Sequence, residues 1–146
     1  MRKIITMIAS VLVVMAMTSA IDTVPEVARE GYQAPNITIH SGNQSVELQQ
    51  LRGSAVILSL WSSANPESRL ANIAAKHEAA RRGMKHVSVN LDRSADLARA
   101  IAAIAGVDAI YCPQSQRQQL AERWGVDLNT GEGLGNWHIG ADGVIL

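Results

Sequence analysis

The sequence of 146 residues has no phenylalanine, a single cysteine and only 3% aromatic residues. A core without phenylalanine must be built from aliphatic side chains and a few tryptophans. The lone Cys112 excludes an internal disulfide, and it excludes a conventional redox site made of two thiols. The fold must therefore be stable without a disulfide, and any thiol chemistry would depend on Cys112 alone.

An excess of charge of one sign is also missing, because 13 Lys and Arg residues balance 13 Asp and Glu residues. Nucleic-acid surfaces normally need a concentrated basic patch, so we expect no nucleic-acid partner. The histidines show no short ligand spacing such as His-x-x-x-His. His40 and His138 lie on expected strands and could approach one another in a sheet. Spacing nevertheless predicts no metal site, and we expect no cofactor.

The first 20 residues have the features of a secretory signal peptide. Arg2 and Lys3 precede an apolar stretch, which ends in the small residues Thr18, Ser19 and Ala20. We expect cleavage after Ala20, with an uncleaved membrane anchor as the alternative. No cysteine lies near this point, so a lipoprotein is not expected. The predicted location is periplasmic or secreted, with residues 21–35 as a linker and residues 36–146 as one domain.

Strands and helices are expected to alternate along this domain. A hairpin is predicted over residues 36–48, a buried strand over 55–60, and a helix over 66–82. There follow a strand over 85–91, a helix over 94–105, a short strand over 107–111, a helix over 115–124 and a closing hairpin over 134–146. Such alternation predicts parallel crossover units within a mixed sheet flanked by helices.

Apolar side chains predict which side of each long helix faces the core. In the first helix the expected buried side carries Leu70, Ile73, Ala74, His77 and Ala80. In the second helix it carries Leu97, Ile101 and Ile104. Trp61, Trp124 and Trp137 are expected to pack in the core or a groove. The glycine-rich residues 131–135 precede a strand and not a helix, which predicts a loop and not a phosphate cradle.

Residues 60–68, Leu-Trp-Ser-Ser-Ala-Asn-Pro-Glu-Ser, join the most strand-like run to the longest helical pattern. Asn65 is a preferred N-cap, Pro66 suits the first helical position, and Glu67 complements the helix dipole. These residues predict an ordinary helix start. The alternative is an altered site that binds a ligand through free N–H groups at the helix end.

Three motifs resemble the TlpA/ResA group of extracytoplasmic thiol–disulfide oxidoreductases. Residues 31–38 resemble the family's Gly-x-x-Ala-Pro-x-Phe entry to its first hairpin. Residues 46–61 resemble its Leu-x-x-Leu-Lys-Gly-Lys-x-Val-Leu-Leu-x-Phe-Trp run, and residues 140–145 resemble its Ile-Asp-x-x-Gly-x-Ile hairpin. The resemblance implies a thioredoxin-like α/β fold: a mixed β-sheet flanked by helices, with an N-terminal β-hairpin.

The chain departs from this family at the positions that matter most for activity. The two family cysteines match Asn65, which has no nucleophile, and Ser68, whose hydroxyl has no base in evident reach. The family has a proline, usually cis, beside the redox site, and the matching residues 133–136 contain none. A C-terminal helix usually closes the fold, and the sequence ends at Leu146. The face under that helix would then be bare, covered by the N-terminal region or paired with another subunit.

We therefore expect a redox-inactive thioredoxin-like domain of the cell envelope that acts as a binding or structural module. Its expected partner is a protein or peptide, or a second copy in a homodimer, with no membrane contact beyond the signal sequence. The alternative is a thiol–disulfide oxidoreductase that uses Cys112 as a single thiol, which requires an exposed Cys112. A decayed or truncated gene product without activity is a third hypothesis.

Overall fold

Ten short elements follow one another in the computed structural model, which describes residues 23–146. The expected signal peptide lies outside the described residues. The strands are β1 (Thr38–Ser41), β2 (Gln44–Glu47), β3 (Val56–Trp61), β4 (Lys85–Asn90), β5 (Ala109–Tyr111) and β6 (Gly135–Ile139). The helices are the 3₁₀ turn η1 (Leu48–Leu51), α2 (Pro66–Arg82), α3 (Ala95–Ala105) and α4 (Gln114–Arg123). Among the described residues, no helix is long and apolar enough to cross a membrane.

The strands form two sheets, an antiparallel β1–β2 hairpin and a four-stranded sheet of order β5-β4-β3-β6. Strands β3, β4 and β5 are parallel, and β6 is antiparallel to β3. The register places Trp61 opposite Asn90, and Asn90 opposite Tyr111. The three parallel strands therefore end on one line, and the segments that follow them meet at this carboxyl edge.

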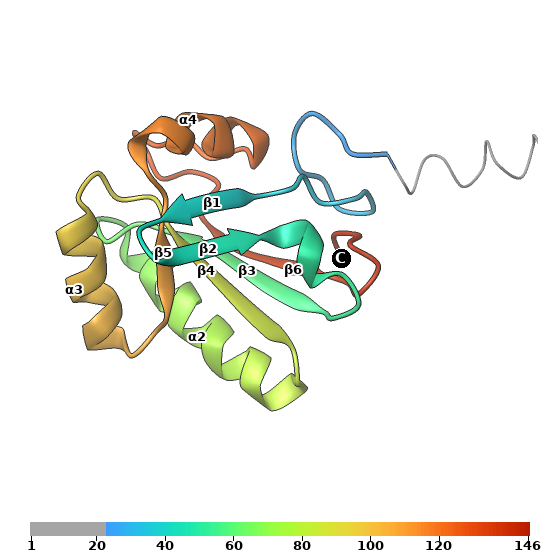
Figure 1. Ribbon diagram of the computed structural model, residues 1–146, viewed down its shortest axis with the longest axis horizontal. Coiled ribbons are helices and arrows are strands. Elements are labelled where there is room, and N and C mark those ends of the chain that lie inside the picture. The colour runs from blue at the N-terminus through green and yellow to red at the C-terminus, as the bar shows by residue number, and fades with distance from the viewer. Residues whose placement is uncertain (1–22) are drawn as a thin grey trace, which may run out of the picture.

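The two faces of the larger sheet are packed in chemically different ways. Alternate residues of β3 and β4 join the hairpin, α4 and β6 in one large aliphatic core that includes Trp124. The other face, under α2, has only a small apolar cluster of Ile57, Ala75 and Ala79. In Figure 1, α4 lies at the top, α2 at the bottom, and the strands between them. The hairpin and α4 therefore cover one side of the sheet, and α2 covers the other.

Hydrogen bonds hold α2 to its polar face of the sheet. The Trp61 indole donates to Ser88 Oγ at 2.8 Å, and Ser88 donates to Asn72 Oδ1 of α2 at 2.8 Å. A second chain runs across the sheet from His86 Nε2 to Ser59 Oγ (2.9 Å), from Ser59 to Asn136 Oδ1 (2.7 Å), and from Asn136 Nδ2 to the Ala71 carbonyl (2.9 Å). Buried polar groups are expensive unless paired, so this network specifies the seating of α2.

The predicted buried sides of the two long helices were wrong for most residues, because only Ile73 and Ile101 of the two predicted sets are even half-buried. Helix α2 buries Ser68, Asn72, Ala75 and Ala79, and leaves Leu70 68% exposed. Helix α3 buries Ala98 and Ala102, whereas Leu97 and Ile104 are 49% and 83% exposed. Small residues allow both helices to lie close to the sheet, and polar partners on the sheet select the polar side of α2. Apolar spacing alone therefore identified the wrong side.

The boundaries of the predicted helices and strands agree closely with the structure. Asn65 caps α2, Ser94 caps α3, and Gly83 and Gly106 end these helices in the left-handed conformation. The closing hairpin is present, but its second arm is reduced to isolated bridges. No helix follows β6 among the described residues. The expected mixed α/β fold with an N-terminal hairpin is confirmed.

The segment interpreted as a linker is packed against the domain from residue 28 onward. The Ala28 amide donates to the Arg123 carbonyl at 2.8 Å, and the Ile145 amide donates to the Tyr32 carbonyl at 2.9 Å. Ala28 and Ala34 are members of the large core. This segment therefore lies on the side of the sheet opposite α2.

Burial of His86 predicts a dependence of stability on pH. Desolvation, and secondarily the charge of Lys76, lowers the pKa of His86 below 6.5. As the pH falls, His86 takes up its proton in the unfolded chain before it does so in the folded protein. The free energy of unfolding therefore has its full value above about pH 6.5 and decreases below that pH. We expect the urea midpoint to fall between about pH 7.5 and about pH 5.

The variant His86→Gln should show a flatter pH dependence over this range, whereas His77→Gln, at an exposed position, should keep the original slope. Equal slopes in both variants would contradict the assignment to His86.

Candidate functional site

The start of α2 is capped by the side chain of Asn65. Asn65 Oδ1 accepts from the Ser68 amide at 2.8 Å, Pro66 occupies the first turn, and Glu67 adds an acidic side chain there. The Ser68 hydroxyl donates to the Asn65 carbonyl at 2.9 Å and accepts from the Ser62 amide at 3.2 Å. Ser68 is only 3% exposed. Both side chains are therefore engaged in holding the helix start, and neither is placed as a nucleophile.

Asp92 organises the connection that leads into this helix. Its carboxylate accepts from the Ser62 hydroxyl at 3.0 Å, from the Ser63 amide at 2.7 Å and from Asn90 Nδ2 at 3.0 Å, and it also bonds the Ser63 hydroxyl. Asp92 is 6% exposed. A buried carboxylate is tolerated only with such partners. It joins the ends of β3 and β4, and so fixes the approach of the chain to Asn65.

The glycine-rich loop that follows α4 lies against the same helix start. A Cβ on Gly131 would come within 2.7 Å of Asn65 Nδ2, and a Cβ on Gly133 would overlap the Gly125 carbonyl oxygen. Both glycines have positive φ, 78° and 87°. The close approach therefore requires glycine here. The run is a loop, as predicted, and it lies beside Asn65.

Cys112 is remote from solvent. It follows β5, is 0% exposed, and its amide donates to the Asn90 carbonyl at 2.9 Å. Burial raises the pKa of the Cys112 thiol to about 11, despite the nearby positive charge of Arg117. The side chain is therefore a protonated thiol enclosed within the large core.

The predicted core role of the tryptophans is confirmed, because Trp61 and Trp124 are each 1% exposed and Trp137 packs edge-on against Trp124 at 5.3 Å.

His40 and His138 do not meet, since they lie in different sheets. His138 instead lies 3.4 Å from Glu78. No cluster of three or more His, Cys, Asp or Glu side chains suited to a metal occurs between residues 23 and 146.

A broad groove of about 1270 Å³ runs along the carboxyl edge of the sheet beside the start of α2. It is lined by Ser62 and Ala64, by the loop 91–94, by one side of α4 and by residues 125–129. Such edges are the usual ligand-binding positions of open α/β sheets.

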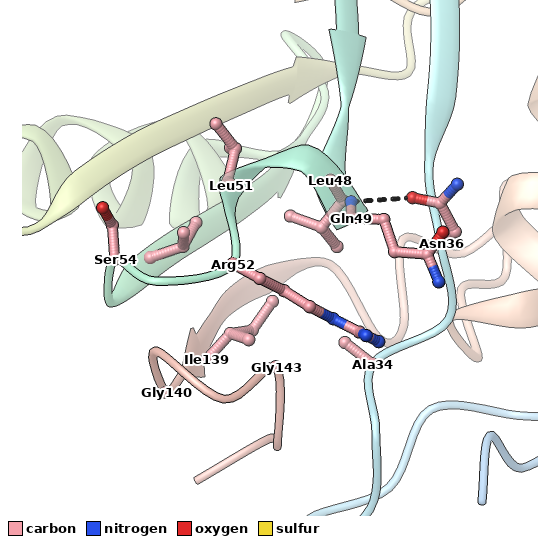
Figure 2. A pocket seen from close by; sticks show the side chains of 11 residues that line it. Ala34, Asn36, Leu48, Gln49, Leu51, Arg52, Ser54, Ile139, Gly140 and Gly143 are labelled. Atoms are coloured by element: carbon pink, nitrogen blue, oxygen red, sulfur yellow. Dashed lines mark hydrogen bonds between the residues drawn. The ribbon is translucent and has the colours of Figure 1, made fainter. Parts of the chain in front are cut away.

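The pocket in Figure 2 is much smaller than this groove. Arg52 extends along it toward Ala34, and its volume of about 20 Å³ has room for about one water molecule.

Sequence reasoning identified the helix start but missed Asp92 and Arg117. Asp92 comes two residues after the end of β4, a position at which polar side chains often face the carboxyl edge, and this placement was the available signal. Arg117 lies in the first half of a polar helix, and no sequence pattern shows that it is buried.

Removing the Asp92 carboxylate should destabilise the fold. Asp92→Ala leaves the donors of Ser62, Ser63 and Asn90 without their shared acceptor, and we expect a loss of about 3 kcal/mol in the free energy of unfolding. Urea denaturation monitored by tryptophan fluorescence measures it. The control is Asp96→Ala, because the Asp96 side chain is 93% exposed. An equal, small effect of both substitutions would show that Asp92 does not organise this edge.

Comparison with solved structures finds thioredoxin-like proteins, several of which are described as thiol–disulfide oxidoreductases. No protein-family model and no curated protein matches the chain. The thioredoxin domain of a thiol-disulfide oxidoreductase from Bacteroides vulgatus is 17% identical, with a TM-score of 0.68 over 82% of this chain and 86% of that one. A thioredoxin-like protein from Parabacteroides distasonis is 21% identical (TM-score 0.61; 84% and 88% covered).

A thiol:disulfide interchange protein from Bacteroides sp. is 16% identical, with a TM-score of 0.64 over 83% of this chain and 80% of that one. At these identities the comparisons establish the fold. The chain therefore has the thioredoxin-like fold found in thiol–disulfide oxidoreductases, built on a sequence with one cysteine.

Proposed function

We propose that the protein is a redox-inactive thioredoxin-like module of the cell envelope, which binds a protein or peptide segment in the groove beside the start of α2. The observation that carries the proposal is the internal hydrogen bonding of Asn65 and Ser68. We infer that these residues occupy the two cysteine positions of the oxidoreductases. An amide cap and a buried serine hydroxyl cannot exchange with a disulfide, because neither supplies a thiolate.

The burial of Cys112 supports this inference against the single-thiol alternative. A mixed disulfide requires a thiolate that a partner sulfur can reach. Cys112 is 0% exposed, and its pKa is raised to about 11. At neutral pH the thiol is protonated and enclosed, so a partner could reach it only through local unfolding.

The groove supports binding as the retained activity. It lies where the segments after β3 and β4 meet α4, and its volume of about 1270 Å³ leaves room for a peptide segment. The Asp92 hydrogen bonds hold its floor in one conformation, which reduces the entropy lost on binding. The predicted signal sequence supports action in the periplasm or outside the cell.

The proposal predicts no disulfide chemistry in the native protein. We expect no reduction of insulin disulfides in the presence of dithiothreitol beyond the rate of dithiothreitol alone. Cys112 should react with a chromogenic thiol reagent only after denaturant is added, and a Cys112→Ala variant provides the background. Catalysed insulin reduction that disappears in Cys112→Ala would instead establish the single-thiol enzyme.

Restoring two thiols tests whether the helix start matches the oxidoreductase positions. The double variant Asn65→Cys/Ser68→Cys places cysteines at residues whose side chain and amide already touch at 2.8 Å. We expect a reversible intramolecular disulfide and measurable insulin reduction. Mass spectrometry after alkylation counts the free thiols.

A matched double variant, Glu67→Cys/Ala71→Cys, has the thiols further along α2 and should lack reductase activity. If the 65/68 variant forms no disulfide under oxidising conditions, the positional match is wrong.

A further inference from the structure

The groove contains a buried cation without an anionic partner. Arg117 on α4 lines the groove and is only 8% exposed. One of its terminal nitrogens, Nη2, donates to the Tyr111 hydroxyl at 2.7 Å and, at 3.5 Å, to the Cys112 carbonyl. Nε is buried and has no hydrogen-bond partner, and no carboxylate pairs with Arg117 among residues 23–146. Buried charges in proteins are normally paired, so this guanidinium lacks the group that would balance it.

The acidic residues of the groove are engaged elsewhere. Asp92 is saturated by Ser62, Ser63 and Asn90, as described above. Glu122 lies at the other end of α4 and accepts from Gln118 at 3.0 Å, and Asp127 accepts from the Asn129 amide at 2.8 Å. These carboxylates keep their negative charges, but none of them forms an ion pair with Arg117 among the described residues.

The start of α4 adds a second set of donors at the same end of the groove. Pro113 is the N-cap of this ten-residue helix and provides no side-chain cap. The Gln116 amide donates to the Pro113 carbonyl at 3.0 Å, which leaves the amides of Gln114 and Ser115 without an acceptor from a cap. Gln114, in the first turn, also lines the groove. Free N–H groups at a helix start and a nearby guanidinium together favour an anionic oxygen group.

We propose that Arg117 and the start of α4 bind a carboxylate of a peptide ligand in this groove. The inference rests on the proposed peptide-binding function and specifies the chemistry of its ligand. A carboxylate matches the planar guanidinium, which can donate from more than one nitrogen. The Tyr111 hydroxyl donates to the Arg93 carbonyl at 3.2 Å while it accepts from Arg117. It therefore holds the guanidinium in position.

Paired peptides that differ by one charged group test the proposal. The probes are Ac-Ala-Ala-Glu-NH2, Ac-Ala-Ala-Gln-NH2 and Ac-Ala-Ala-Gln with a free C-terminal carboxylate. Each is titrated into the purified 15N-labelled protein, and the amide shifts of Gln114 and Ser115 are followed. We expect at least one carboxylate peptide to bind at least about tenfold more tightly than the neutral peptide. The comparison of the two charged peptides shows whether a side-chain or a terminal carboxylate is preferred.

Arg117 variants locate the binding site. Arg117→Met should reduce the charged-to-neutral affinity ratio to about one, and Arg117→Lys, which keeps the charge without the planar fork, should give an intermediate value. Circular dichroism selects the variant that is folded for this comparison. Arg123→Gln is the matched control, because Arg123 is an exposed arginine on the same helix, and it should keep the wild-type ratio.

Equal affinities of the neutral and charged peptides for the wild type would overturn the proposal, and so would an unchanged ratio in a folded Arg117 variant. Shifts at Gln114 that arise with inorganic phosphate but with neither carboxylate peptide would also overturn it. These outcomes leave the absence of reductase activity untouched. Conversely, reductase turnover by the native protein would contradict the proposed function, but it would leave the ratio of charged-peptide to neutral-peptide affinity unchanged.

Discussion

The Asp92 carboxylate is the contact on which the carboxyl edge of the sheet depends. Four donors from the segments after β3 and within β4 converge on it. Because the group is nearly inaccessible to water, its charge is tolerated only while these hydrogen bonds persist. The path from Trp61 to Asn65 is thereby held in one conformation. The cap of α2, the wall of the groove and the contact with the glycine-rich loop all follow from that path.

Polar pairing also explains why α2 lies as it does. In most sheet–helix packing, a stripe of large apolar side chains seats the helix. Here the sheet contributes four polar side chains to the interface: Ser59, His86, Ser88 and Asn136. Helix α2 contributes the Asn72 side chain and a backbone carbonyl, which accept hydrogen bonds from Ser88 and Asn136. The larger aliphatic residue Leu70 lies outside. The polar contacts of this interface favour one register, because a shifted helix would leave buried groups unpaired.

The same reasoning separates the two unusual side chains of the β5–α4 region. Cys112 is neutral, enclosed and satisfied by apolar packing, so nothing about it calls for a ligand. Arg117 is charged, nearly enclosed and without a counter-ion, so its environment is incomplete. The proposed carboxylate site therefore depends on Arg117 and not on the thiol, and the proposed binding function needs no paired thiols.

The sequence by itself determined the order and bounds of the elements, the caps at Asn65 and Ser94, and the absence of a dithiol site. These are local properties, set by turn chemistry, capping and the identity of single residues. Only the tertiary structure decided which sides of α2 and α3 are buried, that residues 28–34 belong to the packed domain, and that Asp92 and Arg117 reach one groove. Those outcomes depend on partners distant in the chain. The free energy of burying a polar or charged side chain is set by the groups it meets, which no local pattern specifies.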